Sequence, residues 1–175
     1  MKSTRFVFGR ALAVLYALLF VSFGFMSCQQ EDDDNGLPDG VYELSDNSAL
    51  IGTWQSSYGE IFKITSTSLS NGGSWGDTYA GNNLVVSYTN DEETAGYIYI
   101  KYTRAMNPDY SYSETAPDVG KWYAIAFKEL TASSISLSGA YNASGKTSTE
   151  TLEEAISTFT IANGYFTSYS ECVKQ

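Results

Sequence analysis

The chain has 175 residues, of which 20 are acidic and 10 are basic, so its formal net charge is −10. A protein this acidic repels nucleic acid and anionic lipid headgroups, and neither is an expected partner. There is no histidine, which removes the commonest general base and the commonest metal ligand. We therefore expect a protein that is not an enzyme and that uses no metal and no cofactor.

The N-terminal residues have the pattern of a secretory signal peptide. Three basic residues precede an apolar stretch, residues 11–25, which falls short of the roughly 20 residues that a membrane-spanning helix needs. The small residue Ser27 then lies directly before Cys28. This order predicts a leader over residues 1–27 that is cleaved during export. An ordinary secretory signal, with Cys28 present by chance, and an uncleaved anchor are the two alternatives.

The segment Phe25-Met26-Ser27-Cys28 resembles the lipobox of bacterial lipoproteins, with Phe25 where that family more often has Leu. The resemblance implies cleavage before Cys28 and attachment of a diacylglycerol to its thiol. Each buried methylene contributes about 0.8 kcal/mol, so two or three acyl chains such as palmitate hold a protein on a membrane durably. The resemblance thus implies a lipid anchor at Cys28 in the bacterial cell envelope, which we expect to be in the outer membrane.

Residues 28–48 are predicted to form an acidic flexible tether, followed by one domain over residues 49–175. The stretch Gln29–Asp34 resembles the export tags that some bacterial lineages place after the lipidated cysteine to send lipoproteins to the cell surface. A solvated acidic spacer is the other interpretation. Residues 31–36 approach the pattern of a calcium loop, but the twelfth position is Tyr42 and no helix flanks the segment, which favours the spacer.

Alternation of apolar and polar residues dominates the rest of the chain and predicts antiparallel strands. Asp91-Glu92-Glu93 is expected in an exposed turn between two of them. The predicted strands cover residues 50–55, 60–65, 77–80, 83–88, 96–104, 121–130 and 133–141, with further turns at residues 58–59, 71–73 and 81–82.

One helix is predicted near the C-terminus. Thr151 and Glu154 form a capping box that marks its start, and Asn163-Gly164 marks its end. A last short strand is predicted over residues 165–169. Apolar residues at positions i, i+4 and i+7 form one stripe on this helix, namely Leu152, Ile156 and Phe159.

Sequential strands followed by a late helix and a short strand resemble the lipocalin and calycin arrangement, and Gly52-Thr53-Trp54 matches the lipocalin Gly-x-Trp of the first strand. The resemblance implies an all-β fold with one C-terminal helix, an antiparallel up-and-down β-barrel with a small apolar ligand in its mouth. In lipocalins the Trp plugs the closed end and a late arginine packs on it. The late basic residues that could replace that arginine here are Lys128 and Lys174.

A second resemblance concerns residues 120–173. Four short segments are similar to segments of a group of small spirochaete surface lipoproteins. They are Gly-Lys-Trp-Tyr-Ala, Thr-Leu-Glu-Glu-Ala, Asn-Gly-Tyr-Phe and Tyr-Ser-Glu-Cys. This resemblance supports the cell-surface location and implies no activity.

The candidate ligand-binding residues are aromatic. Trp54, Trp75, Trp122, Tyr97 and Tyr99 would line a barrel or form a sugar-stacking surface, and otherwise they are core residues and cross-strand pairs. The core interpretation is favoured for Trp54 and Trp122. Trp75 lies in a glycine-rich stretch and is expected at the rim.

Cys172 is the second of the two cysteines in the chain. Because Cys28 is assigned to the lipid, Cys172 has no partner for an intrachain disulfide. Without a basic neighbour to stabilise the thiolate, it is expected to be a buried, unreactive thiol.

Two functions are compatible with these features. The first is a lipid-anchored, non-catalytic binding module for a small apolar or amphipathic ligand. The alternative is a surface adhesin or assembly lipoprotein with a protein or glycan partner and no small-molecule ligand. A binding module needs a cavity, whereas an adhesin needs an exposed patch.

Overall fold

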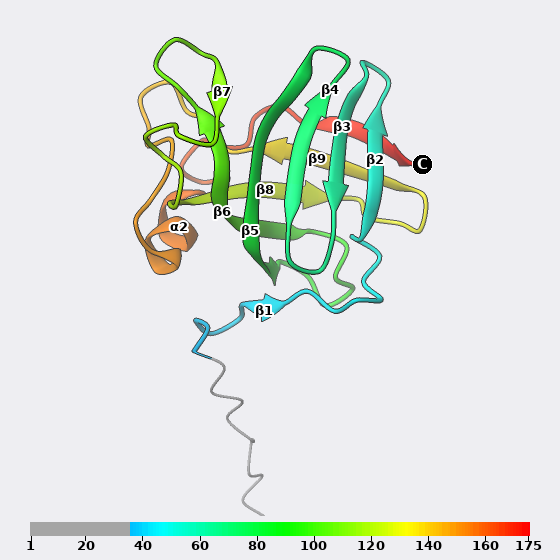
Figure 1. The fold of residues 1–175 in the computed structure, drawn as a ribbon. Coiled ribbons are helices and arrows are strands. Elements are labelled where there is room, and N and C mark those ends of the chain that lie inside the picture. The colour runs from blue at the N-terminus through cyan, green and yellow to red at the C-terminus, as the bar shows by residue number, and fades with distance from the viewer. Residues whose placement is uncertain (1–35) are drawn as a thin grey trace, which may run out of the picture. The chain divides into compact units, whose positions relative to one another are not determined.

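The strands of residues 36–175, the part of the chain that the computed structural model describes, close into an antiparallel barrel (Figure 1). Eight strands form its wall, and each pairs with the next barrel strand along the chain. The prediction of an all-β, up-and-down barrel with one helix near the C-terminus is confirmed. The wall consists of β2 (Gly52–Ser56), β3 (Glu60–Ile64), β4 (Leu69–Gly73), β5 (Gly76–Tyr88), β6 (Gly96–Met106), β8 (Trp122–Lys128), β9 (Ser134–Gly139) and β10 (Ser170–Lys174).

Two short strands lie at the ends of the barrel. β1 (Tyr42–Glu43) pairs with the last part of β5, and β7 (Tyr112–Ser113) pairs with the end of β6. The barrel itself closes where β10 pairs with β2, with Lys174 opposite Trp54. Figure 1 shows the turns β2–β3 and β4–β5 at one end, which we call the upper end, and β1 at the other.

The predicted turn at Gly81-Asn82 is wrong, because β5 runs through it as one strand. The register of β5 against β6 shifts on both sides of these residues, and Asn83 has a φ of +51°. A Cβ on Gly81 would lie 2.7 Å from the carbonyl oxygen of Lys101, so the two backbones approach too closely for a side chain. The glycine marks a bulge that bends a barrel strand.

The predicted turn at residues 71–73 is also wrong. These residues are the last three of β4, and the chain turns at residues 74–75 instead. Asn71 faces the barrel interior, where its side chain is hydrogen-bonded to Glu60 and Thr78. An asparagine followed by two glycines has the composition of a turn, but here it occupies a strand with its side chain inward.

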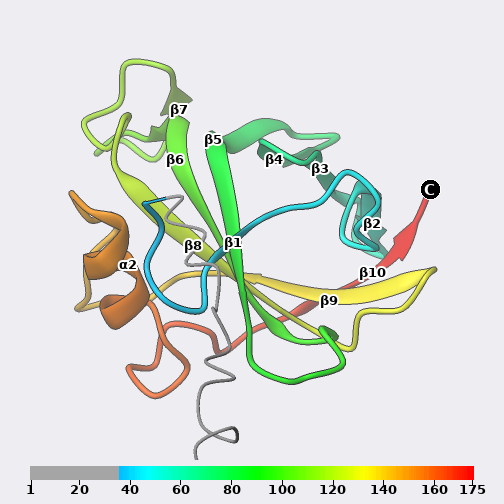
Figure 2. The ribbon, with the colours of Figure 1, turned by 90° about the horizontal axis from the view of Figure 1, so that it is seen from below.

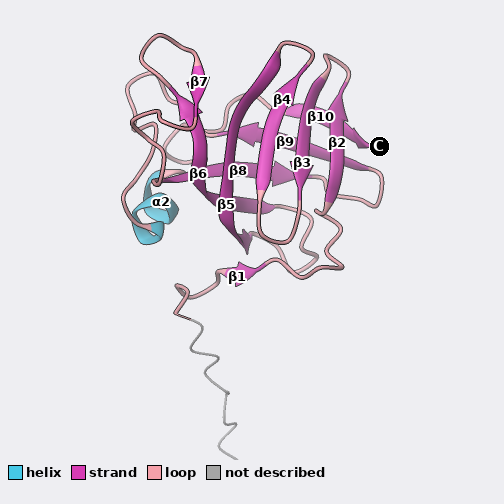
Figure 3. Ribbon diagram, in the orientation of Figure 1, coloured by secondary structure: helices cyan, strands magenta, loops and turns pink. Residues whose placement is uncertain are grey.

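The helix α2 (Leu152–Thr158) begins as predicted (Figure 3). The side chain of Thr151 accepts a hydrogen bond of 3.2 Å from the backbone N–H of Glu154, whose carboxylate accepts one of 3.3 Å from the N–H of Glu150. These two bonds satisfy amides that the first turn leaves without partners. The buried stripe consists of Leu152, Ala155 and Phe159, while Ile156 is only half-buried.

The helix ends at Thr158, earlier than Asn163. Asn163 nevertheless acts at this end, because its side-chain amide donates to the carbonyl oxygens of Ser157 and Thr158 at 3.1 and 2.9 Å. The last strand is β10, so the strand predicted over residues 165–169 is wrong. Tyr165 and Phe166 have the apolar character of a strand but pack under α2 instead.

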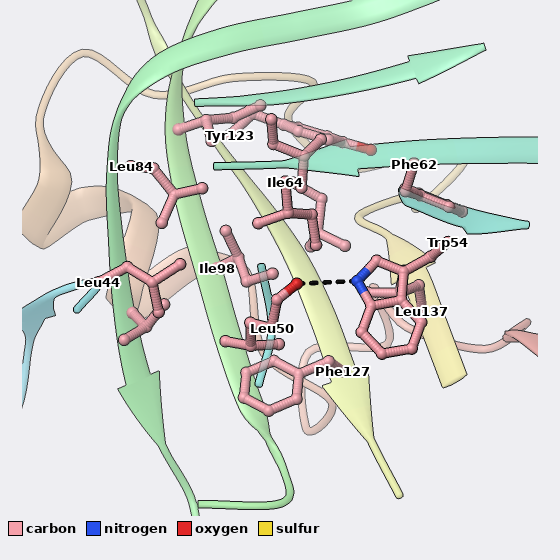
Figure 4. Packing of buried hydrophobic residues seen from close by; sticks show 14 of the residues in the cluster. Leu44, Leu50, Trp54, Phe62, Ile64, Leu84, Ile98, Tyr123, Phe127 and Leu137 are labelled. Carbon is pink, nitrogen blue, oxygen red and sulfur yellow. Dashed lines mark hydrogen bonds between the residues drawn. The ribbon is translucent and has the colours of Figure 1, made fainter. Parts of the chain in front are cut away.

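The barrel has two apolar cores. One fills its interior, and Figure 4 shows side chains of this cluster converging from several strands. The other lies between the outer face of the wall and α2, where Phe159 meets the small residues Ala124 and Ala126 of β8. Small residues in β8 allow the helix and the chain after it to pack closely on the wall.

Residues 36–50, which we call the strap, cross the lower end of the barrel before β2 begins (Figure 2). Val41, Leu44 and Leu50 are buried in the two cores. The described part of the predicted tether therefore packs with the barrel as part of one compact unit. The sequence of the strap does not indicate a packed segment, because its few apolar residues are separated by acidic and polar ones. The predicted leader, Cys28 and the acidic stretch at residues 29–34 lie outside the described residues.

Candidate functional site

Trp54 lies inside the barrel near the strap and has no exposed surface. Its indole N–H donates a hydrogen bond of 2.8 Å to the carbonyl oxygen of Leu50 in the strap (Figure 4). The ammonium of Lys174 lies 4.9 Å from the centroid of the Trp54 ring, whereas that of Lys128 lies over Tyr169. Of the two late basic residues, Lys174 is therefore the one that packs on Trp54. Trp54 and the strap together close the lower end of the barrel.

Three other predicted ligand residues lie on the outer face of the wall. The ring of Tyr97 is 6.2 Å from that of Tyr99 and 5.5 Å from that of Phe166. Tyr99 is buried, and desolvation raises its pKa to about 12. Trp122 belongs to the same outer core and also lines a groove between the strap and α2. The structure thus brings Tyr97, Tyr99 and Trp122 together, but on the other side of the wall from Trp54.

Trp75 is at the rim, as expected, with 59% of its surface exposed in the turn between β4 and β5. A Cβ on Gly73 would lie 2.8 Å from the Trp75 ring and 2.7 Å from the carbonyl oxygen of Gly59. The turns β2–β3 and β4–β5 therefore touch. Tyr58, in the first of these turns, is 89% exposed. Two exposed aromatic residues are thus close to each other at the upper end.

The interior near the upper end carries a polar cluster of Glu60, Asn71, Thr78 and Ser170. Glu60 begins β3 on the same face as Phe62, which is buried in the barrel. One carboxylate oxygen of Glu60 accepts a hydrogen bond of 2.9 Å from the side-chain amide of Asn71, and the other accepts one from the hydroxyl of Ser170. The side-chain oxygen of Asn71 accepts a further bond from Thr78. Asn71 is buried, while the other three residues are half-buried.

A tyrosine triad, Tyr79, Tyr102 and Tyr123, comes from three strands at the same end. The rings of Tyr102 and Tyr123 stack with centroids 4.8 Å apart, and the rings of Tyr79 and Tyr123 form a T-shaped pair with centroids 5.2 Å apart. The hydroxyl of Tyr123 donates a hydrogen bond of 3.1 Å to the carbonyl oxygen of Ala140. Tyr102 and Tyr123 are buried, and Tyr79 is half-buried. Aromatic faces and a carboxylate therefore occupy one end of an otherwise apolar interior.

The charge of Glu60 influences its neighbours. Burial raises the pKa of each tyrosine of the triad above its ordinary value, and the charge of Glu60 raises the pKa of Tyr79 and Tyr123 further. Burial, with a further contribution from Glu60, also raises the pKa of Cys172 to about 11. Cys172 is a free thiol and is buried, as predicted.

No lysine or arginine within residues 36–175 forms an ion pair with Glu60. Three basic residues form ion pairs with other carboxylates, namely Arg104, Lys121 and Lys146. Two lie over aromatic rings, namely Lys128 and Lys174. The remaining two, Lys63 and Lys101, are on the outward-facing sides of their strands. Two neutral donors alone therefore stabilise the Glu60 carboxylate.

The polar cluster and the tyrosine triad are not among the site residues predicted from the sequence. A signal for Glu60 was present, because it precedes Phe62 by two positions and so faces the same side of the predicted strand. A carboxylate on the apolar face of a strand is uncommon and marks a position to examine. Asn71 gave no such signal, since it was assigned to a turn.

Within the described part of the chain, no three or more Asp, Glu or Cys side chains are placed to hold a metal ion. No helix of residues 36–175 combines the length and apolar character needed to cross a membrane. Comparison of the chain with models of protein families, with curated proteins and with solved structures finds no match.

Proposed function

We propose that this protein is a lipid-anchored lipoprotein of the bacterial cell envelope whose barrel is a non-catalytic binding module. The proposed site is the polar cluster together with the tyrosine triad, and the proposed ligand is a small amphipathic molecule. The observation that supports this site is the Glu60 carboxylate, which faces inward between Asn71 and Ser170 at one end of the barrel. Ligand sites in the mouths of barrels combine aromatic walls with a few placed polar groups, and this end has both.

A carboxylate inside a barrel lowers stability unless its hydrogen-bonding capacity is satisfied. An ionised carboxylate offers about four acceptor positions, and the structure shows two donors to Glu60. Apolar residues at positions 60 and 71 would extend the core without this desolvation cost. A half-buried carboxylate with acceptor positions still open therefore favours a role in recognition over a role in packing.

The proposed lipid anchor is compatible with access to this site. The strap starts eight positions after Cys28, so the intervening chain reaches at most roughly 28 Å when extended. The strap crosses the lower end of the barrel (Figure 2), whereas Glu60 of the polar cluster begins β3 directly after the β2–β3 turn of the upper end. The chain therefore enters the described domain at the end opposite the polar cluster, so attachment through Cys28 does not require the tether to cover the proposed site.

Native mass spectrometry of residues 36–175, purified from cells without detergent, tests the proposal. We expect an added small-molecule mass that is lost on denaturation, present in wild type and in the control Glu92→Gln but lost in Glu60→Gln. Glu92 is a suitable control because it is exposed in the turn between β5 and β6. A bare mass for the wild-type protein in repeated preparations would contradict a tightly bound ligand.

The exposed aromatic residues favour a second function, an interaction protein without a small-molecule ligand. Tyr58 and Trp75 are 89% and 59% exposed at one end of the barrel, where they would be free to contact a protein or a glycan. Arrays of host glycans and matrix proteins, probed with wild type and with Tyr58→Ser/Trp75→Ser, test this function. A binder that the double variant loses would support it, while equal binding by both proteins would contradict it.

A further inference from the structure

We infer that the site at the upper end of the barrel recognises the ammonium group of a small organic amine, with Glu60 as the anionic partner and Tyr79 as the aromatic wall. This inference rests on the proposed binding function and specifies its ligand class. It follows from three features of the site: a carboxylate without a cation, aromatic rings beside it, and partial exposure of both.

The first feature is the unmatched charge. Asn71 and Ser170 are neutral donors, and no lysine or arginine within residues 36–175 forms an ion pair with Glu60. Hydrogen bonds to a charged group are about twice as strong as those between neutral groups. An ammonium placed on Glu60 would therefore supply both the missing charge and the missing donors.

The second feature is the tyrosine triad. The face of an aromatic ring is negative and its edge is positive, so a cation within about 6 Å of a ring centroid is attracted to the face. Tyr102 and Tyr123 cover each other by stacking, whereas Tyr79 meets Tyr123 at an interplanar angle of 65°. Tyr79 is also the half-buried member of the triad. It is therefore the ring most accessible to a ligand that reaches Glu60.

A metal ion fits the site less well than an organic cation. Calcium takes six to eight oxygen ligands, and the described residues provide no cluster of three or more carboxylates, thiols or imidazoles. The side-chain oxygen of Asn71 already accepts a hydrogen bond from Thr78. One carboxylate beside aromatic rings suits a cation whose remaining surface is apolar.

The overall charge supports the same conclusion. The chain has a formal net charge of −10, and an acidic surface raises the local concentration of cations. The affinity for an amine should therefore fall as the ionic strength rises, because salt screens this attraction.

The experiment compares 2-phenylethylamine with 2-phenylethanol, which has the same aromatic body but no positive charge. Binding to residues 36–175 is followed by the nuclear magnetic resonance shifts of the tyrosine rings and of the Glu60 amide. We expect the amine to bind at least about tenfold more tightly than the alcohol, since hydrogen bonds to charged groups contribute at this level. We also expect the shifts to be confined to the upper end of the barrel.

Variants of single residues test which side chains cause the preference for the amine over the alcohol. Glu60→Gln should remove the preference for the amine while retaining acceptor capacity for Asn71, and Tyr79→Leu should weaken amine binding. The control Glu92→Gln, at the other end of the barrel, should change neither. The spectrum of each variant shows directly whether it is folded, and the comparison of amine with alcohol in wild type needs no variant.

Equal binding of amine and alcohol, or a preference that survives in Glu60→Gln, would overturn the inference. Absence of any amine-induced shift at the upper end would overturn it as well. Any of these results would refute amine recognition without testing the binding function itself. Native mass spectrometry tests that function separately, because a retained neutral molecule would support a binding module whose ligand is not an amine.

Discussion

Lys174 and Trp54 face each other across the strand pair that closes the barrel, with the Lys174 ammonium 4.9 Å from the centroid of the indole. The same ammonium donates a hydrogen bond of 3.3 Å to the carbonyl oxygen of Ala49 at the end of the strap. One side chain near the C-terminus therefore joins the last strand, the first barrel strand and the strap. The closed end of the barrel depends on this contact.

Replacing Lys174 tests the contact. We expect Lys174→Met to lower the free energy of unfolding by about 1 kcal/mol, because cation–π pairs contribute between about 0.5 and about 2 kcal/mol. Lys174→Arg should keep most of the stability. The matched control is Lys63→Met, at an exposed position on the outside of β3. Urea denaturation of the three variants measures the effect, and an equal loss for Lys174→Met and Lys63→Met would contradict it.

Gly52 leaves room for the Lys174 side chain. Its φ is +148°, and a Cβ there would lie 2.5 Å from Cε of Lys174. We expect Gly52→Ala to cost more stability than Gly59→Ala, because Gly59 also has a positive φ, +84°, but open space around it. A double-mutant cycle with Lys174→Ala separates the collision from backbone strain. Additive losses in the cycle would show that Lys174 is not involved.

The strap should contribute to stability as part of the fold. Truncation of a buried leucine to alanine usually costs about 2 to 5 kcal/mol, and Leu44 is buried in the barrel core. We therefore expect Leu44→Ala to fall in this range, and Asp46→Ala, which is exposed, to change the free energy by less than about 0.5 kcal/mol. Thermal and urea denaturation measure both. Wild-type stability in Leu44→Ala would mean that the strap is only loosely attached.

The tyrosine triad predicts a loss of stability at alkaline pH. The folded protein raises the pKa of Tyr79, Tyr102 and Tyr123 above the ordinary value, so it keeps protons that the unfolded chain releases. Their contribution is fully present below about pH 10 and declines as the pH rises further. Cys172, with a pKa of about 11, acts in the same direction.

The free energy of unfolding, measured at several pH values from about 8 to about 12, should therefore decrease above about 10. The absorbance of tyrosinate should develop in two phases, with the exposed tyrosines first and the triad only on unfolding. Tyr79→Phe should reduce the slope. A single phase without a loss of stability would contradict the burial of the triad.

The lipid anchor has its own test. We expect wild-type protein to incorporate a labelled palmitate analogue and to fractionate with membranes, and Cys28→Ala to lose both properties. Cys172→Ala is the matched control, because it removes the other cysteine of the chain. Protease treatment of intact cells would then distinguish a surface-exposed protein from one that faces the periplasm. Label in Cys28→Ala, or its loss in Cys172→Ala, would refute the assignment.

Most of the local structure could be predicted from the sequence where the pattern was regular. The strand predicted over residues 96–104, observed as β6, follows from side-chain alternation. The capping box of Thr151 and Glu154 follows from the hydrogen-bonding needs of a helix start. Composition predicted turns at Asn71 and at Gly81, but both residues lie in strands. The reason at both positions is tertiary. Asn71 supplies the inward side-chain amide of the polar cluster. Gly81 lies so close to β6 that a side chain would not fit.

The sequence by itself determined the antiparallel strands, the start of the helix and the exposed position of Trp75, because local propensity and side-chain period suffice for these. The closed barrel was expected only from the resemblance to lipocalins. Tertiary structure alone decided which residues meet. It placed Tyr97 and Tyr99 on the outside of the wall, brought Lys174 onto Trp54, and gathered Glu60 with Ser170, 110 positions away in the chain. Contacts of this kind depend on the curvature and register of a closed sheet, and no short stretch of sequence carries that information.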